Sequence, residues 1–183
     1  MPEPLLIALC IFLCLLGNGF FSGSEIAILS VRKSRIESLL AEGSKAAKRV
    51  KELQDHMDDF LAIAQIGVTL MGTLAGVLGG YLASRHIQPM LEASGLERIL
   101  PPALEATFVV GVGIVFVELV LGELVPKALA LRYTETVALL ASGPYVLMRR
   151  GSRWAILILT ASTRVVLRLF GIREQNARTF VSE

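Results

Sequence analysis

The sequence predicts an all-α membrane protein that crosses the bilayer three times. Hydrophobic residues make up 54% of the 183 residues and charged residues only 19%, against roughly 45 to 50% and 25% in soluble domains. The charges gather in blocks separated by long uncharged stretches, and a stretch of about 20 such residues can cross a bilayer as a helix. A soluble enzyme is therefore not expected. A net charge of +2 is too small to predict nucleic-acid binding.

Three segments have the length and composition of a span, at about residues 4–30, 59–85 and 104–132. The loop between the first two, residues 31–58, holds most of the basic residues near the spans, namely Arg32, Lys33, Arg35, Lys45, Lys48, Arg49 and Lys51. By the positive-inside rule this loop is cytoplasmic, which puts the N-terminus outside and the C-terminus in the cytoplasm. Ala46, Val50, Leu53 and Met57 recur at helical spacing, so the loop is predicted to be a helix.

The region after the third span has a different character. Residues 134–172 are apolar, but Arg149, Arg150 and Arg153 divide them into two runs that are short for a span. Such runs suit helices that lie at the membrane interface or pack on the bundle, and a fourth span is the alternative interpretation. The polar residues 173–183 have the composition of the start of a linker.

Polar residues inside the spans are the candidates for chemistry, because polar groups in hydrocarbon are costly and tend to face a bundle interior or a cavity. Each span supplies one set. The first has Asn18 and Ser22 on one helix face, followed by Ser24 and Glu25; the second has Gln65, Thr69 and Thr73; the third has Gly122, Glu123, Pro126 and Lys127.

The third set predicts a cation site. Pro126 has no backbone N–H, so within a helix it would free the carbonyl of Gly122 and kink the chain. Glu123 beside it carries a full negative charge, which is expensive at this depth unless it is neutralised. A cation bound by this carbonyl, this carboxylate and hydroxyl groups from the other spans would satisfy both. Ligands that are all oxygens suit hard ions such as Mg²⁺, Ca²⁺ or Na⁺.

Each set also has an interpretation without an ion. Glu123 and Lys127 are four residues apart and could form an ion pair with each other. Thr69 and Thr73 could bond to carbonyls one turn earlier, and Asn18 and Ser22 could hold helices together. Glu118 is either a second acid that faces a cavity or a protonated packing residue, and these residues alone do not decide. Gly72, Gly76 and Gly80 recur on one face of the second span, a surface suited to close helix packing and, in a purely structural interpretation, to a dimer seam.

Three segments carry a resemblance to a known family. They are Asn18-Gly19-Phe20-Phe21-Ser22-Gly23-Ser24-Glu25, Gln65-Ile66-Gly67-Val68-Thr69-Leu70 and Gly122-Glu123-Leu124-Val125-Pro126-Lys127. In this order and spacing they resemble the signature segments of the CorC and cyclin M (CNNM) magnesium transport proteins. The match runs over nearly the whole chain.

The resemblance implies a homodimer in a cell membrane, the inner membrane of a bacterium, with three transmembrane helices and a cytosolic juxtamembrane belt at residues 134–172. It implies export of Mg²⁺ by alternating access, coupled to inward Na⁺, without enzymatic activity. Full-length relatives continue into cytosolic CBS modules that bind ATP, so we expect this chain to be the membrane domain of a longer protein. The alternatives are a Mg²⁺-sensing regulator and a dimerising membrane anchor.

The resemblance also implies roles for residues. The Mg²⁺ ligands would come from Asn18, Ser22, Gly67, Thr69, Thr73, Gly122 and Glu123, and the helix break and gate from Ser24, Glu25, Pro126 and Lys127. In the structural interpretation given above, and not from the resemblance, Gly72, Gly76 and Gly80 would pack the dimer. The chain departs from the family where an asparagine or serine often stands in the second segment, because it has Val68 and Gly72 there. Thr69, Thr73 or backbone carbonyls would have to substitute as ligands.

Overall fold

The computed structural model describes residues 3–93 and 101–151, and after these only single positions at 154, 158, 161, 162, 165, 166, 168 and 169. In the two continuous ranges every regular element is helical, which confirms the predicted class. The elements are α1 (Glu3–Ser30), α2 (Lys33–Ala41), α3 (Lys45–Asp55), α4 (Met57–Leu82), η1 (Ala83–Ile87), α5 (Gln88–Ala93), α6 (Pro102–Val117), η2 (Glu118–Leu124), α7 (Val125–Arg132) and α8 (Thr134–Gly151), where η denotes a π-helix.

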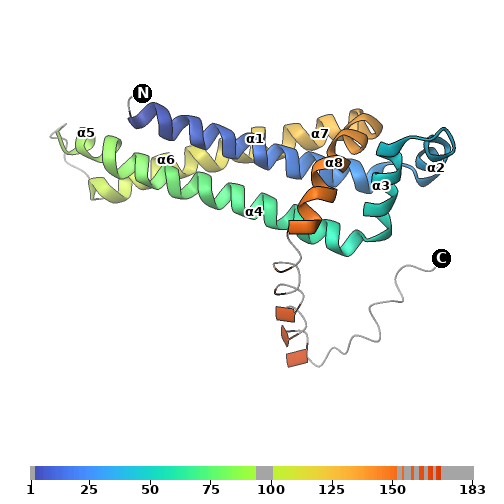
Figure 1. Cartoon of the computed structure of the whole chain (residues 1–183). Helices are drawn as coiled ribbons and strands as arrows, with labels where there is room; N and C mark the ends of the chain where they lie inside the picture. Colours follow the sequence, from blue (N-terminus) through green and yellow to red (C-terminus); the bar gives the residue numbers. More distant parts are fainter. Residues whose placement is uncertain are drawn as a thin grey trace.

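Three continuous helical stretches are long and apolar enough to cross a membrane, at Glu3–Ser30, Met57–Ala93 and Pro102–Arg132. The second runs beyond the predicted 59–85 because η1 and α5 continue it to Ala93. In Figure 1, α1, α4 and α6 lie side by side in an elongated bundle, with the N-terminus and α5 at one end and α2 and α3 at the other. We call the group of α2, α3 and α8 the cap.

The predicted break at Pro126 takes the form of a π-helical segment. In η2 the backbone hydrogen bonds run from residue i to residue i−5 instead of i−4. The N–H of Val125, for example, donates to the carbonyl of Val120. Pro126 is the second residue of α7, directly after this segment. The second span repeats the arrangement, since η1 ends at Ile87 and Pro89 is the second residue of α5. In α-helical register the proline ring would collide with the carbonyl four residues earlier, and in both spans the hydrogen-bond ladder shifts register just before the proline.

The predicted helical loop at residues 31–58 is two helices. Gly43 has a φ of +84°, a left-handed conformation that glycine adopts easily and that ends helices. The Ser44 hydroxyl then accepts a hydrogen bond from the N–H of Ala47 at 3.2 Å and caps α3. The spacing of apolar residues predicted the helical state, but the Gly-Ser break within it was not recognised.

The main buried core lies where the cap meets the bundle. Ile36 of α2, Val50 and Leu53 of α3, Phe60 of α4 and Tyr145 of α8 are almost completely buried and belong to one cluster. Helix α8 covers the first part of the predicted belt and packs on α1 and α3. The rest of that region, apart from the single positions named above, and the predicted linker lie outside the described residues.

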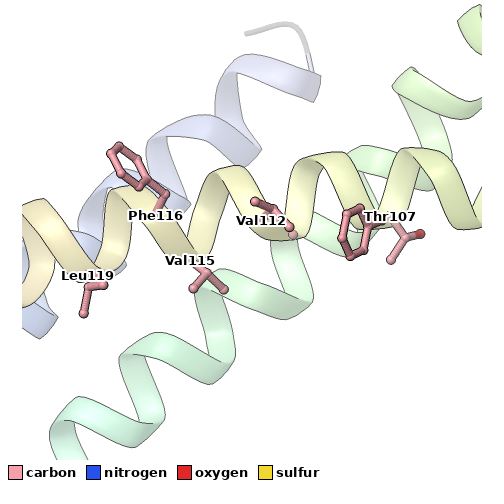
Figure 2. A pocket seen from close by; sticks show the side chains of 7 residues that line it. Thr107, Val112, Val115, Phe116 and Leu119 are labelled. Carbon is pink, nitrogen blue, oxygen red and sulfur yellow. The ribbon is translucent and has the colours of Figure 1, made fainter.

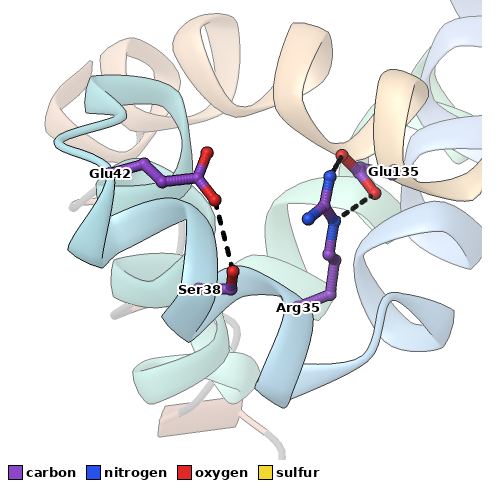
Figure 3. A network of polar contacts seen from close by, with 4 residues as sticks. All are labelled: Arg35, Ser38, Glu42 and Glu135. Atoms are coloured by element: carbon purple, nitrogen blue, oxygen red, sulfur yellow. Dashed lines mark hydrogen bonds and ion pairs between the residues drawn. The ribbon is translucent and has the colours of Figure 1, made fainter.

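Polar contacts fasten α8 to the other cap helices. The guanidinium of Arg35 in α2 forms two hydrogen bonds with the carboxylate of Glu135, at 2.9 and 3.0 Å (Figure 3). Arg149 donates to Glu52 of α3 at 2.6 Å, and Arg49 donates to the Ser142 hydroxyl at 3.2 Å. The cap is therefore held by apolar packing within and by ion pairs at its edge.

The outward face of α6 is apolar and open. Only 6% of the most apolar window of the third span is buried, against 28% for the first span. A groove runs along this face (Figure 2), lined by Thr107, Phe108, Gly111, Val112, Val115, Phe116 and Leu119. A surface of this composition suits lipid chains or another apolar helix far better than water.

Candidate functional site

One face of α1 brings buried polar groups into the bundle. Cys14, Asn18 and Ser22 follow one another at intervals of four residues, and all three are buried. The Asn18 Oδ1 and the Ser22 Oγ are both enclosed and without a hydrogen-bond partner. Buried oxygens nearly always have partners, so two of them on one helix face require an explanation. A bound cation would provide one.

The Asn18 side chain contacts the carboxylate of Glu118. The amide Nδ2 of Asn18 donates to Glu118 Oε1 at 3.2 Å. This donation uses the amino group of Asn18 and leaves its oxygen free, which is the orientation needed to accept a cation. A Cβ atom on Gly72 of α4 would collide with the same carboxylate oxygen. Glu118 therefore reaches a point where α1, η2 and α4 meet.

The backbone of the third span also approaches α1 here. A Cβ on Gly122 would lie 3.0 Å from Asn18 Nδ2, and a Cβ on Gly19 would lie 3.0 Å from the Pro126 ring and 3.7 Å from the Leu121 carbonyl oxygen. Pro126 removes the N–H that would pair with Gly122 in α-helical register or with Leu121 in π-helical register. The predicted free carbonyl is thus that of Gly122 or of Leu121, both in the part of η2 that approaches α1.

Glu123 lies apart from this group. Its carboxylate forms an ion pair with Lys127, four residues later, and the two side chains are about one-third exposed, at 37% and 33%. The structure therefore has the ion pair that the sequence offered as the alternative to a ligand. Glu123 remains a predicted ligand, but its carboxylate contacts Lys127, whereas the carboxylate that contacts Asn18 is that of Glu118.

The polar stripe of the second span points away from the buried oxygens. Gln65, Thr69 and Thr73 are exposed, and Gln65 donates to the Thr69 hydroxyl at 3.4 Å. Gly67, also a predicted ligand, is buried because the ring of Phe21 lies directly over it. The side that α4 turns toward the site is therefore formed by Gly72 rather than by the threonines.

The remaining predicted residues also differ in what lies next to them. No atom lies within 4 Å of a Cβ placed on Gly76 or Gly80, whereas Gly72 faces Glu118. The three glycines therefore do not face a single neighbour in the described chain, and dimer packing stays a prediction. Ser24 is buried and contacts α8, and Glu25 is half-buried.

Glu118 is the residue whose role the sequence left undecided. It precedes Gly122 by four residues and so shares its side of the helix, whereas Glu123 is one position further round. The spacing of Glu118, Gly122 and Pro126 contained this signal. Its contact with Asn18 depends on the register of η2, which sequence spacing does not provide.

The arrangement can hold a hard cation. It offers an amide oxygen, a hydroxyl, a carboxylate and a free carbonyl, which are ligands suited to Mg²⁺, Ca²⁺ or Na⁺. Among the described residues no group of three or more His, Cys, Asp or Glu side chains is placed to bind a metal, so the candidate site relies on amide, hydroxyl and carbonyl oxygens besides the Glu118 carboxylate. The Cys14 thiol lies one turn from Asn18 on the same face.

Three apolar spans around buried oxygen donors define the membrane domain of a polytopic protein. A family model described as "Cyclin M transmembrane N-terminal domain" matches residues 9–183. The chain therefore belongs to the cyclin M (CNNM) family, as its signature segments predicted.

Curated relatives agree with this assignment. A UPF0053 protein of Synechocystis is 38% identical over 94% of this chain and 38% of its own length. The UPF0053 protein YhdP of Bacillus subtilis is 35% identical over 85% and 35%. The UPF0053 inner membrane protein YfjD of Escherichia coli is 28% identical over 85% and 33%. The chain spans little more than a third of the length of these relatives.

Proposed function

We propose that this chain is a Mg²⁺-translocating membrane domain. The observation that carries the proposal is the pair of buried, unpartnered oxygens on Asn18 and Ser22, together with the Glu118 carboxylate that Asn18 contacts. A carboxylate in a bilayer needs a counter-charge. A cation would provide this charge, and the two free oxygens would be further ligands for the cation. The cation enters between α1 and the π-helical segment, with Gly122 or Leu121 adding a backbone carbonyl.

Family membership favours Mg²⁺ among the hard cations, because the resemblance implies magnesium transport. Mg²⁺ usually keeps several waters and is bound by one or two carboxylates. The candidate site has one such carboxylate, Glu118, at the point where three helices meet. Glu123 lies one residue beyond Gly122 and would become a second carboxylate if its ion pair with Lys127 opened.

The proposed cycle is export by alternating access with inward Na⁺ as the coupling ion, in a homodimer in the bacterial inner membrane. The basic loop at residues 31–58 puts the cap in the cytoplasm by the positive-inside rule. Lys127 then lies on the cytoplasmic side of the site, where it serves as gate or counter-charge. Transport, not enzymatic turnover, is the proposed activity.

Thermal unfolding of the purified chain in detergent, with and without MgCl₂, tests the site. A ligand that binds only the folded state stabilises it by about 2.7 kcal/mol at a hundred times its Kd. We expect Mg²⁺ to raise the unfolding midpoint, and Glu118→Gln and Ser22→Ala to abolish that rise. The matched control is Glu37→Gln, which removes an exposed carboxylate of α2 and should leave the rise unchanged.

Glu123→Gln separates the two carboxylates. If only this variant loses the response, Glu123 is the charged ligand and the Glu118 assignment is wrong. If Mg²⁺, Ca²⁺ and Na⁺ all leave the unfolding midpoint of the wild type and of every variant unchanged, the chain is an anchor and not a carrier.

Flux in liposomes that contain only this chain tests translocation. We expect Mg²⁺ movement that an opposing Na⁺ gradient accelerates and that Glu118→Gln removes. Binding without flux would identify a Mg²⁺ sensor, and flux indifferent to Na⁺ would exclude the proposed coupling.

A further inference from the structure

Tyr145 of α8 is the largest fully buried side chain of the described protein. It comes from the cap, yet its ring contacts two helices of the bundle. Its ring centroid lies 4.8 Å from that of Phe60 in α4, and 5.8 and 6.0 Å from those of Phe20 and Phe21 in α1. Aromatic pairs at these distances attract one another. Tyr145 thereby joins α8 to both helices at one point.

The Tyr145 hydroxyl reaches the backbone turn that carries Ser22. It lies 3.1 Å from the Ser24 hydroxyl and donates to the Phe21 carbonyl at 3.5 Å. The Ser24 hydroxyl lies within hydrogen-bond distance of the Phe20 and Phe21 carbonyls, at 2.5 and 3.1 Å. All of these contacts fall within one turn of α1, between Phe20 and Ser24.

A serine that bonds to a carbonyl one turn earlier tends to bend its helix. Here the turn that Ser24 bonds to holds Ser22 at its centre, with Asn18 one turn before it. Ser24 has a single proton to donate, and two carbonyls, those of Phe20 and Phe21, lie within its reach. The Tyr145 hydroxyl supplies a second proton by donating to the Phe21 carbonyl. Burial raises the pKa of Tyr145, which keeps its hydroxyl protonated and able to donate.

The aromatic contacts act on the same turn from the other side. The Phe21 ring fills the space above Gly67 of α4, so the turn cannot rotate without moving that ring. Tyr145 packs against the Phe21 ring edge-on, at an interplanar angle of 86°. The backbone turn that carries Ser22 is therefore held between Gly67 of α4 and Tyr145 of α8.

We propose that Tyr145 is a positioning residue for the cation site, and that through Ser24 it makes the affinity of Asn18 and Ser22 for Mg²⁺ depend on where α8 lies. The inference rests on the proposed function. It adds a route by which the cap changes ion binding without contacting the ion.

The test is a double-mutant cycle on Mg²⁺ affinity, with the full chain in detergent and MgCl₂ as the probe. Tyr145→Phe keeps the ring and removes the hydroxyl, and Ser24→Ala removes its partner. Each should weaken the Kd for Mg²⁺ about threefold to tenfold, the range expected for one hydrogen bond. The double variant should bind Mg²⁺ no more weakly than the weaker-binding single variant, because both changes break the same contact between Tyr145 and Ser24.

The matched control is Tyr81→Phe. Tyr81 donates to Glu3 at 2.7 Å, so this variant also loses one tyrosine hydroxyl bond between elements, but in the part of the spans far from α8. It should leave the Kd for Mg²⁺ unchanged. If Tyr145→Phe does not fold, Ser24→Ala alone against Tyr81→Phe decides.

The outcomes separate the inference from the proposed function. A wild-type chain without any Mg²⁺ response refutes both. A wild-type response with an unchanged Kd in Tyr145→Phe and Ser24→Ala, even if their ion-free unfolding midpoints fall, shows a merely structural contact and overturns the inference alone. Independent, additive losses from the two variants would also overturn it.

Discussion

Two glycines of α4 determine which side chains reach the bundle interior. Gly67 leaves room for the ring of Phe21, and Gly72 leaves room for the Glu118 carboxylate. Both were first singled out for other roles, Gly67 as a ligand and Gly72 as part of a dimer seam. In the structure each provides space for a side chain from another span, so a glycine in a span can shape a site without contributing an atom to it.

Gly67→Ala should destabilise the folded chain. The added Cβ would overlap the Phe21 ring, which Tyr145 also restrains, and overpacking of this kind costs about 1–3 kcal/mol. Gly113→Ala is the matched control, because nothing lies within 4 Å of a Cβ at that position of α6. Alanine there should be neutral or stabilising by up to about 1 kcal/mol. Unfolding midpoints in detergent provide the measurement, and equal midpoints for the two variants would contradict this account.

The π-helical segments have a common cause. Both η1 and η2 end two residues before a proline, Pro89 in one case and Pro126 in the other. Each closes with a bond from residue i to residue i−5, from Gln88 to Ala83 and from Val125 to Val120. In α-helical register the proline ring would collide with the carbonyl four residues earlier. A one-residue shift lets the helix continue past it.

The consequence for the site lies in η2 alone. The shift in register turns Glu118 and Gly122 toward Asn18, whereas η1 lies at the far end of the bundle from the cap (Figure 1). The same change of register therefore lies beside the candidate site in one span and far from it in the other.

Pro126→Ala should restore α-helical register in the third span. The chain should stay folded, with unchanged helix content by circular dichroism, but the Mg²⁺-dependent rise in midpoint should shrink because Glu118 turns away from Asn18. Pro89→Ala makes the same change after η1 and should preserve the rise. A full Mg²⁺ response in Pro126→Ala would mean that the register of η2 does not position the site.

The molecule as a whole has two unlike parts. The cap and the adjoining ends of α1 and α4 enclose most of the buried apolar residues, including Val50, Leu53 and Phe60. The third span, by contrast, exposes nearly all of its apolar window. The hydrophobic effect drives the burial of apolar residues in the cap core. The apolar surfaces of the spans instead require lipid or another chain around them. Tyr145 joins the two parts next to the candidate site.

The sequence predicted the parts of this architecture that depend on composition and periodicity. Uncharged stretches located the three spans, and helical spacing located the loop helices. It could not predict contacts that depend on register and tertiary packing. Thr69 and Gly72 are three residues apart, but α4 turns only Gly72 toward Glu118. Tyr145 was likewise an ordinary residue of a predicted belt, because its role depends on how α8 crosses α1.

The ion pair between Arg35 and Glu135 predicts how the cap responds to pH. It lowers the pKa of Glu135 and raises that of Arg35. A carboxyl whose folded pKa lies below its unfolded value, near 4.3 for Glu, stabilises the fold above that value. The contribution is lost as the pH falls through the folded pKa.

Measured as unfolding midpoints, the stability difference between wild type and Arg35→Gln should therefore be positive at pH 7 and vanish in acid. Both side chains are exposed, at 48% and 40%, so the difference should be small and should decrease in high salt. Arg32→Gln is the control in the same exposed stretch. Its effect on the unfolding midpoint should not disappear when the pH is lowered. A difference for Arg35→Gln that persists at a pH where Glu135 is itself protonated in the folded protein would mean that Arg35 stabilises the cap by packing and not through Glu135.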